Sequence, residues 1–173
     1  WSEVGTECRM GFVSGLTMLG CDESESPNKS YAGLADAIRR YCHPSVIRRD
    51  NEELFRRMVF NILVTNDDDH LRNHGFVWDP RLGGWALSPL YDVMPRAAVA
   101  TERYLHLGVG SQGRLADLDN ALAAHAKFTL SQSKACEIMS NVWAVVREWR
   151  VYFDQYGVAE EQMDKVATAF RHI

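Results

Sequence analysis

The stretch VTNDDDHLRNHGF, from Val64 to Phe76, places three aspartates, two histidines and two asparagines within thirteen residues. Each of the three adjacent carboxylates raises the cost of ionising its neighbours. The stretch follows directly on an apolar helical pattern, and a helix C-terminus already carries negative partial charge. Local stability therefore does not explain the aspartates. They serve either a site that needs carboxylates or a solvated turn.

The bulk properties indicate one globular domain, residues 1–173, with room for a hydrophobic core. Hydrophobic residues make up 46% of the chain and charged residues 24%, which is ordinary for a globular protein. The net charge is −4, and the arginines are scattered as pairs rather than gathered in one stripe. We therefore expect no direct binding of nucleic acid.

Cysteine usage and the chain start indicate the cellular compartment. The cysteines show neither C-x-x-C pairing nor zinc spacing, and we expect free thiols in a reducing cytosol. No signal peptide begins the chain, and no apolar run approaches the roughly 18 residues of a membrane span. We therefore expect a cytoplasmic protein without membrane association. Because the first residue is Trp1 and not methionine, we also expect a piece of a longer polypeptide. The four cysteines are Cys8, Cys21, Cys42 and Cys136.

Hydrophobic periodicity predicts two helices before the acidic stretch. Ser30 has the character of an N-cap, and the amphipathic helix that it begins stops before Pro44. Asp50 followed by Glu53 resembles a capping box at the start of the next helix. A wide apolar stripe over residues 54–63 then continues to the acidic stretch. Residues 1–20 predict irregular structure or a short helix.

After the acidic stretch the pattern changes to strands and then returns to helices. GFVWD and GWALSPLYD, joined by a turn at PRLGG, predict a β-hairpin. Helical spacing resumes near Asp117 and continues in a longer helix through Trp149, which is broken near Gly157. A short helix over about residues 160–170 closes the chain. The predicted class is mainly α, and α+β when the hairpin is included.

The acidic stretch has the spacing that phosphoryl transfer in protein kinases requires. That chemistry needs a carboxylate beside the substrate hydroxyl and a carboxamide five positions later on magnesium. It also needs a second aspartate beyond a short hairpin, to bridge metal and phosphates. Of the three aspartates only Asp68 has an asparagine, Asn73, five residues on, and the hairpin leads to Asp92. Magnesium prefers a few hard oxygen ligands, so Asn73 and Asp92 with nucleotide phosphates would suit it.

Two segments, RRMVFNILVTNDDDHLRNHGF and LSPLYDVMP, resemble the HipA family of serine/threonine kinase toxins. The family pattern is N-x-x-x-x-N-x-D-x-H-x-x-N with a downstream P-x-Y-D. GFVSGLTMLG and SYAGLADAIRR also lie where the family has similar segments, so the resemblance covers most of the chain. It implies the helical carboxy-terminal lobe of a protein-kinase-like fold, with the short hairpin carrying the metal-binding aspartate. The matching residues are Asn61, Asn66, Asp68, His70, Asn73, Pro89, Tyr91 and Asp92.

The resemblance also implies roles and partners. Asp68 would act as catalytic base, and Asn73 and Asp92 would hold Mg²⁺ and the phosphates of ATP, the co-substrate. His70 and Arg72 would lie in the catalytic loop, where we expect His70 to make a structural hydrogen bond. The activity would be a protein serine/threonine kinase of a toxin–antitoxin pair. An aminoacyl-tRNA synthetase would be the protein substrate and a helix-turn-helix protein the antitoxin.

Other kinase parts are missing from the sequence. It has no G-x-G-x-x-G loop, and none of its four lysines falls on a predicted buried strand. TNDDDH replaces the usual H-R-D and LYDVMP replaces D-F-G, so activation-loop logic does not carry over. By resemblance, an amino-terminal ATP-binding lobe would precede this sequence. We therefore expect the chain alone to fold but to phosphorylate little or nothing. The lysines are Lys29, Lys127, Lys134 and Lys165.

Two other functions remain open from the sequence. A metal-dependent hydrolase would use the Asp/His cluster, in which His70 and His74 lie four apart as on a helical zinc face. A non-catalytic helical interaction domain would use an aromatic surface. The hydrolase ligands would be Asp67, Asp68, Asp69, His70 and His74, and the aromatic surface Trp143, Trp149, Tyr152 and Phe153.

Overall fold

The computed structural model describes residues 10–170 and shows a mainly helical chain with one small sheet. The expected class, mainly α with a minor β part, is confirmed. The helices are α1 (Gly15–Leu19), α2 (Tyr31–Tyr41), α3 (Ile47–Leu63), α4 (Leu118–Ala123), α5 (Gln132–Val146), α6 (Trp149–Gln155) and α7 (Glu160–Val166). Short 3-10 helices are η1 (Glu23–Asn28), η2 (Pro44–Val46), η3 (Leu71–Asn73), η4 (His125–Phe128) and η5 (Ala167–Ala169).

The sheet has three antiparallel strands, β1 (Phe12–Ser14), β2 (Gly75–Asp79) and β3 (Gly84–Leu87), in the order β1-β2-β3. The predicted hairpin is β2 and β3, with Phe76 opposite Leu87. The first strand was not predicted, because residues 1–20 were expected to be irregular or a short helix. It pairs with β2 in the register Phe12 opposite Val77.

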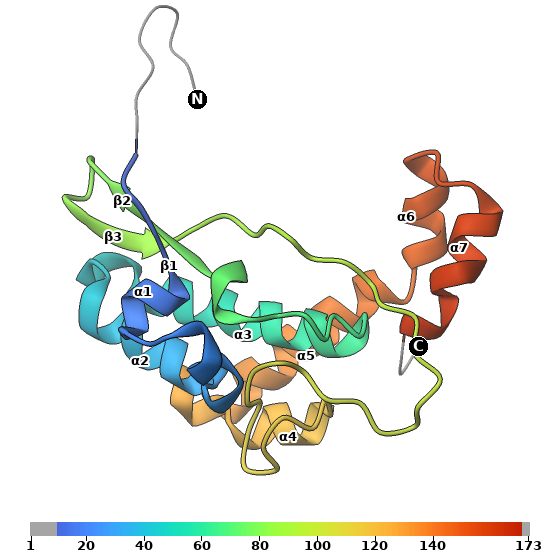
Figure 1. Cartoon of the computed structure of the whole chain (residues 1–173), viewed down its shortest axis with the longest axis horizontal. Coiled ribbons are helices and arrows are strands. Elements are labelled where there is room, and N and C mark those ends of the chain that lie inside the picture. The colour runs from blue at the N-terminus through green and yellow to red at the C-terminus, as the bar shows by residue number, and fades with distance from the viewer. Residues whose placement is uncertain (1–9, 171–173) are drawn as a thin grey trace, which may run out of the picture.

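Helix α3 runs through the middle of the molecule, with α2, α4 and α5 around it (Figure 1). Its apolar stripe is fully buried at Leu54, Phe55, Met58 and Ile62. Burial of each such side chain contributes about 1.5–3 kcal/mol relative to exposure. The helix interior lacks proline and glycine, so it reaches the acidic stretch without interruption. The core thereby fixes where that stretch begins.

The start of α3 differs from the expected capping box at Asp50 and Glu53. The helix begins at Ile47, directly after η2, so Asp50 lies in its first turn. The carboxylate of Asp50 is buried and its Oδ2 accepts a 2.8 Å hydrogen bond from the backbone N–H of Leu87. Asp50 therefore ties α3 to strand β3 instead of capping the helix.

The expected long helix through Trp149 is two helices, because α5 ends at Val146 and α6 begins at Trp149. Figure 1 shows α6 and α7 standing beside the main helical body. Trp149 is buried and its ring stacks on Phe170 with centroids 4.0 Å apart. Tyr152 is more exposed. Of the aromatic surface proposed from the sequence, Trp149 is thus packed against other residues and Tyr152 stays exposed.

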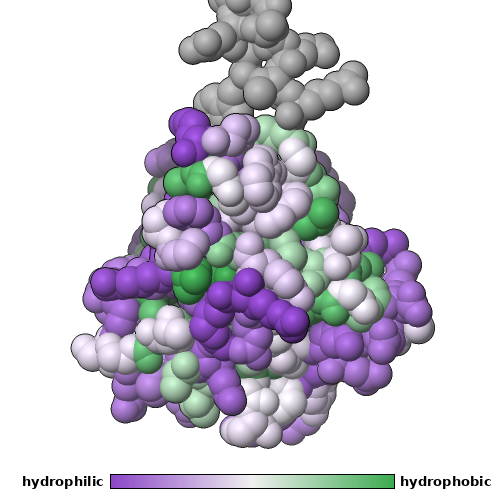
Figure 2. Space-filling model, turned by 90° about the vertical axis from the view of Figure 1, so that its left-hand side faces the viewer, coloured by the Kyte–Doolittle hydropathy of each residue, from purple (hydrophilic) through white to green (hydrophobic). Residues whose placement is uncertain are grey.

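The surface mixes residue types. Figure 2 shows a face on which hydrophobic residues form small patches between hydrophilic ones. Among the helices of residues 10–170, none combines the length and apolar character that crossing a membrane requires. Cys21, Cys42 and Cys136 are free thiols, as expected, and Cys8 lies outside the described residues.

Candidate active site

The acidic stretch forms an irregular loop between α3 and η3. Thr65, with φ of 53°, turns the chain away from the helix axis. Its hydroxyl donates a 2.6 Å hydrogen bond to the carbonyl of Ala169, and the N–H of Asn66 donates to the carbonyl of Asn61. Positive φ is uncommon for a β-branched residue, and it occurs here two residues after the last residue of α3. The loop over residues 64–74 therefore starts from a fixed position.

Asp68 and Asn73 meet across this loop. The Nδ2 of Asn73 donates a 2.9 Å hydrogen bond to the backbone carbonyl of Asp68. Asn73 is buried (8% exposed), whereas the side chain of Asp68 is 59% exposed. Because the nitrogen of the carboxamide is engaged, its oxygen Oδ1 is the atom that a cation could use. The five-residue spacing thus places a hard oxygen and an accessible carboxylate on one loop.

Asp92 lies five residues beyond the end of β3, not on the hairpin as expected. Its φ is 53°, a strained conformation that costs of order 1–3 kcal/mol and that clusters at functional sites. The hydroxyl of Tyr91 donates a 2.5 Å hydrogen bond to the carbonyl of Arg72. Arg96 pairs with Asp67 at 2.7 Å. The segment carrying Asp92 is therefore held to the loop on both sides of the aspartate.

The loop and Asp92 offer donors of the type that Mg²⁺ prefers. Asn73 supplies an amide oxygen and Asp92 an exposed carboxylate, and magnesium usually takes one or two carboxylates and completes its shell with phosphates and water. This donor set fits the metal that the sequence predicts. Two protein donors would also leave coordination positions on the metal for oxygens of nucleotide phosphates.

His70 and Arg72 lie in the same loop. The Nε2 of His70 is 3.9 Å from Oδ1 of Asp68, too long for a hydrogen bond. Its Nδ1 is buried without a hydrogen-bond partner among residues 10–170, so the expected structural hydrogen bond is absent there. Arg72 forms an ion pair of 2.8 Å with Glu23 of η1. His70 thus faces the carboxylate of Asp68, and Arg72 anchors the loop from outside.

Asp69, the third aspartate, points into the core and is held by a chain of hydrogen bonds. Its Oδ2 accepts from the hydroxyl of Tyr31 at 2.5 Å, and its Oδ1 accepts from the backbone N–H of His106 at 2.7 Å. Asn61 donates to the Tyr31 oxygen at 2.8 Å, and Asn66 donates to Asn61 at 3.1 Å. This series of hydrogen bonds links α2, α3, the loop and the residues near His106. It accounts for the two asparagines of the sequence motif that had no assigned role.

Burial governs the protonation of this network. Desolvation raises the pKa of Asp69 to about 6, although the hydrogen bonds from Tyr31 and His106 lower it in part. Desolvation, reinforced by the neighbouring charge of Asp69, also raises the pKa of Tyr31 well above its usual value. The three adjacent aspartates therefore sit in three environments. Asp67 is ion-paired, Asp68 is exposed and Asp69 is buried.

Two further residues support the loop, and neither was predicted. The hydroxyl of Ser26 accepts from the N–H of Leu71 at 3.3 Å and lies 3.0 Å from Nε2 of His106. Burial, with the nearby His70 and Arg114, lowers the pKa of His106. The only sequence signal for Ser26 was its polar loop, which resembles many solvated turns. The small cavity beside them, about 40 Å³, is lined by Leu16, Glu23, Ser26, His70, Arg72 and His106.

The Asp/His cluster does not assemble into a hydrolase-type metal centre. His74 is buried, its ring packs edge-on against Tyr31 at 5.4 Å, and desolvation with Arg57 lowers its pKa to about 3. Within residues 10–170, no three histidine, cysteine, aspartate or glutamate side chains are placed together to hold a metal ion. Asp69 and His74 turn inward, so they do not form a metal site together with the exposed Asp68.

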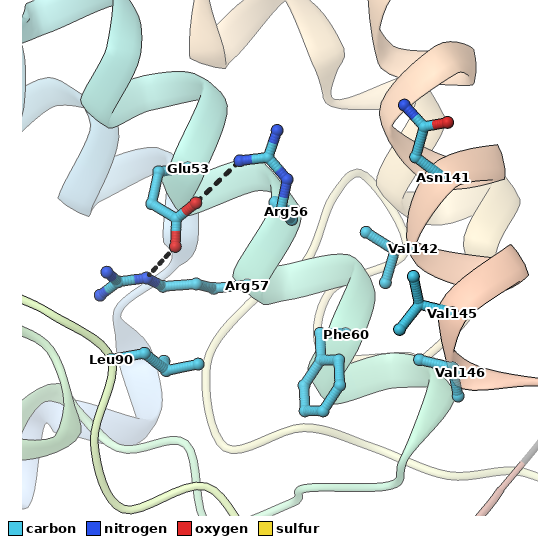
Figure 3. Close-up of a pocket in the computed structure, with 9 residues that line it drawn as sticks. All are labelled: Glu53, Arg56, Arg57, Phe60, Leu90, Asn141, Val142, Val145 and Val146. Atoms are coloured by element: carbon cyan, nitrogen blue, oxygen red, sulfur yellow. Dashed lines mark hydrogen bonds and ion pairs between the residues drawn. The ribbon is translucent and has the colours of Figure 1, made fainter. Parts of the chain in front are cut away.

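A larger cavity of about 300 Å³ lies elsewhere, between α3, α5 and the segment after β3 (Figure 3). Figure 3 shows Phe60 of α3 facing the valines of α5, with Glu53 bonded to both Arg56 and Arg57. Arg57 also donates a 2.7 Å hydrogen bond to the carbonyl of Ser88. None of the predicted site residues lines this cavity. Its lining is Glu53, Arg56, Arg57, Phe60, Leu90, Asn141, Val142, Val145 and Val146.

The fold agrees with the comparison to known proteins. Residues 3–149 match the family model of the HipA-like C-terminal domain, which covers most of the chain. The chain therefore belongs to this family.

The solved structures add a specific relative. The chain is similar to HipA of Shewanella oneidensis MR-1, solved in a toxin–antitoxin complex with HipB and its operator DNA. The TM-score is 0.72 at 16% sequence identity, over 98% of this chain and 44% of that one. At this identity the similarity shows the fold, and the chain spans less than half of that protein's length. No curated protein sequence matches the chain.

Proposed function

We propose that this chain is the C-terminal catalytic lobe of a HipA-like protein serine/threonine kinase, which transfers the γ-phosphoryl group of ATP to a protein hydroxyl. The observation that carries the proposal is the arrangement of Asp68, Asn73 and Asp92. A hydrogen bond closes the loop between the first two. Contacts on both sides of the third attach its segment to that same loop.

The proposed chemistry assigns Asp68 to the substrate. Its exposed carboxylate orients the attacking hydroxyl and accepts its proton as the oxygen bonds to the γ-phosphorus. The bond between the γ-phosphorus and the bridging oxygen breaks, and its electron pair leaves with ADP. His70 lies beside this carboxylate, with its Nε2 3.9 Å from Oδ1 of Asp68, and we assign it no proton-transfer step. Arg72 positions the loop through Glu23.

Asn73 and Asp92 would hold Mg²⁺ through an amide oxygen and a carboxylate. When bound, the metal neutralises charge on the phosphates as it develops. The strained backbone of Asp92 supports this role, because such a conformation persists only where the surrounding contacts enforce it. Here those contacts are the hydrogen bond of Tyr91 and the ion pair of Arg96.

The partners follow from the family and remain part of the proposal. We propose ATP as co-substrate, a cytoplasmic protein substrate of the aminoacyl-tRNA synthetase type and a helix-turn-helix antitoxin. The complex of the Shewanella HipA with HipB supports the antitoxin. Because the chain spans 44% of that relative, the isolated chain should transfer little or no phosphate on its own.

The test is phosphoryl transfer from ATP by the longer protein that carries this domain. Asp68→Asn and Asp92→Asn should each lower the rate by at least 100-fold, on the scale typical of general-base and electrostatic contributions. Asp154→Asn, an exposed aspartate on α6, is the matched control and should leave the rate unchanged. Full biological effect of the Asp68→Asn variant would instead support a non-catalytic interaction domain. Tightly bound zinc in the purified protein would support a hydrolase.

A further inference from the structure

Phe12 is an exposed aromatic residue placed directly on the backbone of β2. Its side chain is 53% exposed, and its ring covers Gly75. A β-carbon at Gly75 would clash with Cε2 of this ring and would lie only 2.6 Å from its Cζ. Only glycine lets the ring approach the strand so closely. The position of the Phe12 ring therefore depends on a residue two places after Asn73.

Tyr91 forms the second side of this aromatic surface. The rings of Phe12 and Tyr91 have centroids 6.2 Å apart at an interplanar angle of 61°. The hydroxyl of Tyr91 donates a 2.5 Å hydrogen bond to the carbonyl of Arg72, which fixes the position of the phenol ring. Tyr91 is therefore fixed by its hydrogen bond, and its ring makes an edge-on contact with the ring of Phe12.

Each ring of this pair is linked through the sequence to one of the two proposed metal ligands. Gly75 follows Asn73 by two residues, a span of at most about 7 Å between Cα atoms, and Tyr91 immediately precedes Asp92. A nucleotide whose phosphates bind at Asn73 and Asp92 therefore has an exposed aromatic face within its own length. Such faces bind bases by stacking, which tolerates different bases because every base has a π-face.

We propose that Phe12, seated on Gly75 and beside Tyr91, is the surface on which the base of the bound nucleotide stacks. This inference rests on the proposed function, since it concerns the same nucleotide. It makes Phe12 a binding residue for the base and gives it no part in holding the phosphates. The contribution of the ring should be similar for adenine and guanine nucleotides.

The experiment separates the base from the phosphates. The longer protein that carries this domain is titrated with Mg²⁺ and ATP, and separately with Mg²⁺ and inorganic tripolyphosphate, which has three phosphates and no base. Phe12→Ala should weaken ATP binding on the order of tenfold and leave tripolyphosphate binding unchanged. Asp92→Asn should weaken both ligands. Tyr156→Ala, which removes an exposed aromatic ring near the end of α6, is the matched control and should change neither.

Phe12→Leu guards against a purely structural effect. Leucine still covers Gly75 but lacks a π-face, so it should keep the folded chain and lose ATP affinity as alanine does. Phe12→Trp, which keeps an aromatic ring, should retain the affinity for ATP. If Phe12→Leu binds ATP like the wild type, or weakens both ligands equally, the inference is wrong. If the wild type binds neither ligand, the proposed function fails as well. Loss of both ligands in Asp92→Asn without any effect at Phe12 overturns the stacking role alone.

Discussion

The hydroxyl of Tyr31 donates a 2.5 Å hydrogen bond to Oδ2 of Asp69, although the two residues are 38 positions apart. Both are fully or almost fully buried. The contact joins α2 to the loop immediately after Asp68. A change in it should therefore affect both the stability of the core and the order of the loop.

Tyr31→Phe should lower the free energy of unfolding by about 1.5–3 kcal/mol, because a buried carboxylate loses a donor and Asn61 loses its acceptor. Chemical denaturation measures the change. Tyr41→Phe, at the exposed end of the same helix, is the matched control and should stay within about 0.5 kcal/mol of the wild type. Equal effects of the two substitutions would contradict the role assigned to Tyr31.

Asp69 should give stability an unusual pH dependence. Its folded pKa is about 6, above its ordinary value of 3.8, so between these values the folded state binds the extra proton. The contribution of Asp69 to stability is therefore largest below about pH 4 and decreases as the pH rises through 6. The decrease is on the order of 3 kcal/mol at most.

The difference in unfolding free energy between the wild type and Asp69→Asn isolates this effect. His74 and His106, which also titrate near the loop, are present in both proteins and cancel. The difference should shift against the wild type from pH 4 to pH 6.5, as measured by urea denaturation at each pH. A difference that is constant or shifts in favour of the wild type would show that Asp69 is not desolvated as described.

The sequence predicted the elements whose signals are local. Ser30 caps α2 by accepting from the N–H of Gly33, and the helix ends before Pro44 as expected. The apolar stripe of α3 and the hairpin also follow from local periodicity. Strand β1 escaped prediction because its three residues form a strand only through pairing with β2, some sixty positions later.

The candidate site was predictable only where its contacts lie close together in the sequence. The spacing of Asp68 and Asn73 lies within one loop, and their contact follows directly from it. Tyr31 fitted an apolar stripe, and nothing nearby in the sequence shows that its hydroxyl meets Asp69. The break between α5 and α6 likewise has no glycine or proline signal. It coincides with the stacking of Trp149 on Phe170, a distant contact.

A substitution at Asp50 tests whether this residue ties α3 to strand β3 instead of capping the helix. Asp50→Ala should destabilise the fold by about 1–3 kcal/mol, because the N–H of Leu87 would lose its partner in the interior. Thermal or chemical unfolding measures this. Asp36→Ala removes an exposed carboxylate from α2 and should have little effect. A small effect at Asp50 would mean that water replaces the lost carboxylate.

Arg96 tests the attachment of the Asp92 segment to the loop. Its ion pair with Asp67 is largely exposed, so Arg96→Ala should change stability by less than about 1 kcal/mol. Binding of Mg²⁺ with ATP should nevertheless weaken several-fold, because the segment carrying Asp92 loses one of its two contacts. Arg81→Ala, which breaks a surface ion pair with Asp79 at the hairpin, should leave binding unchanged. Unaltered binding in Arg96→Ala would contradict this attachment.

The central claim is that Asn73 and Asp92 hold one divalent ion next to Asp68. Mn²⁺ can replace Mg²⁺, and it broadens the NMR signals of nearby nuclei in the ¹⁵N-labelled longer protein that carries this domain. With ATP present, the backbone amide signals of Asp68, Asn73 and Asp92 should broaden first, and Asp92→Asn should abolish this pattern. Broadening centred elsewhere, or at Asp68 and Asn73 without Asp92, would show that these three residues do not share a metal site.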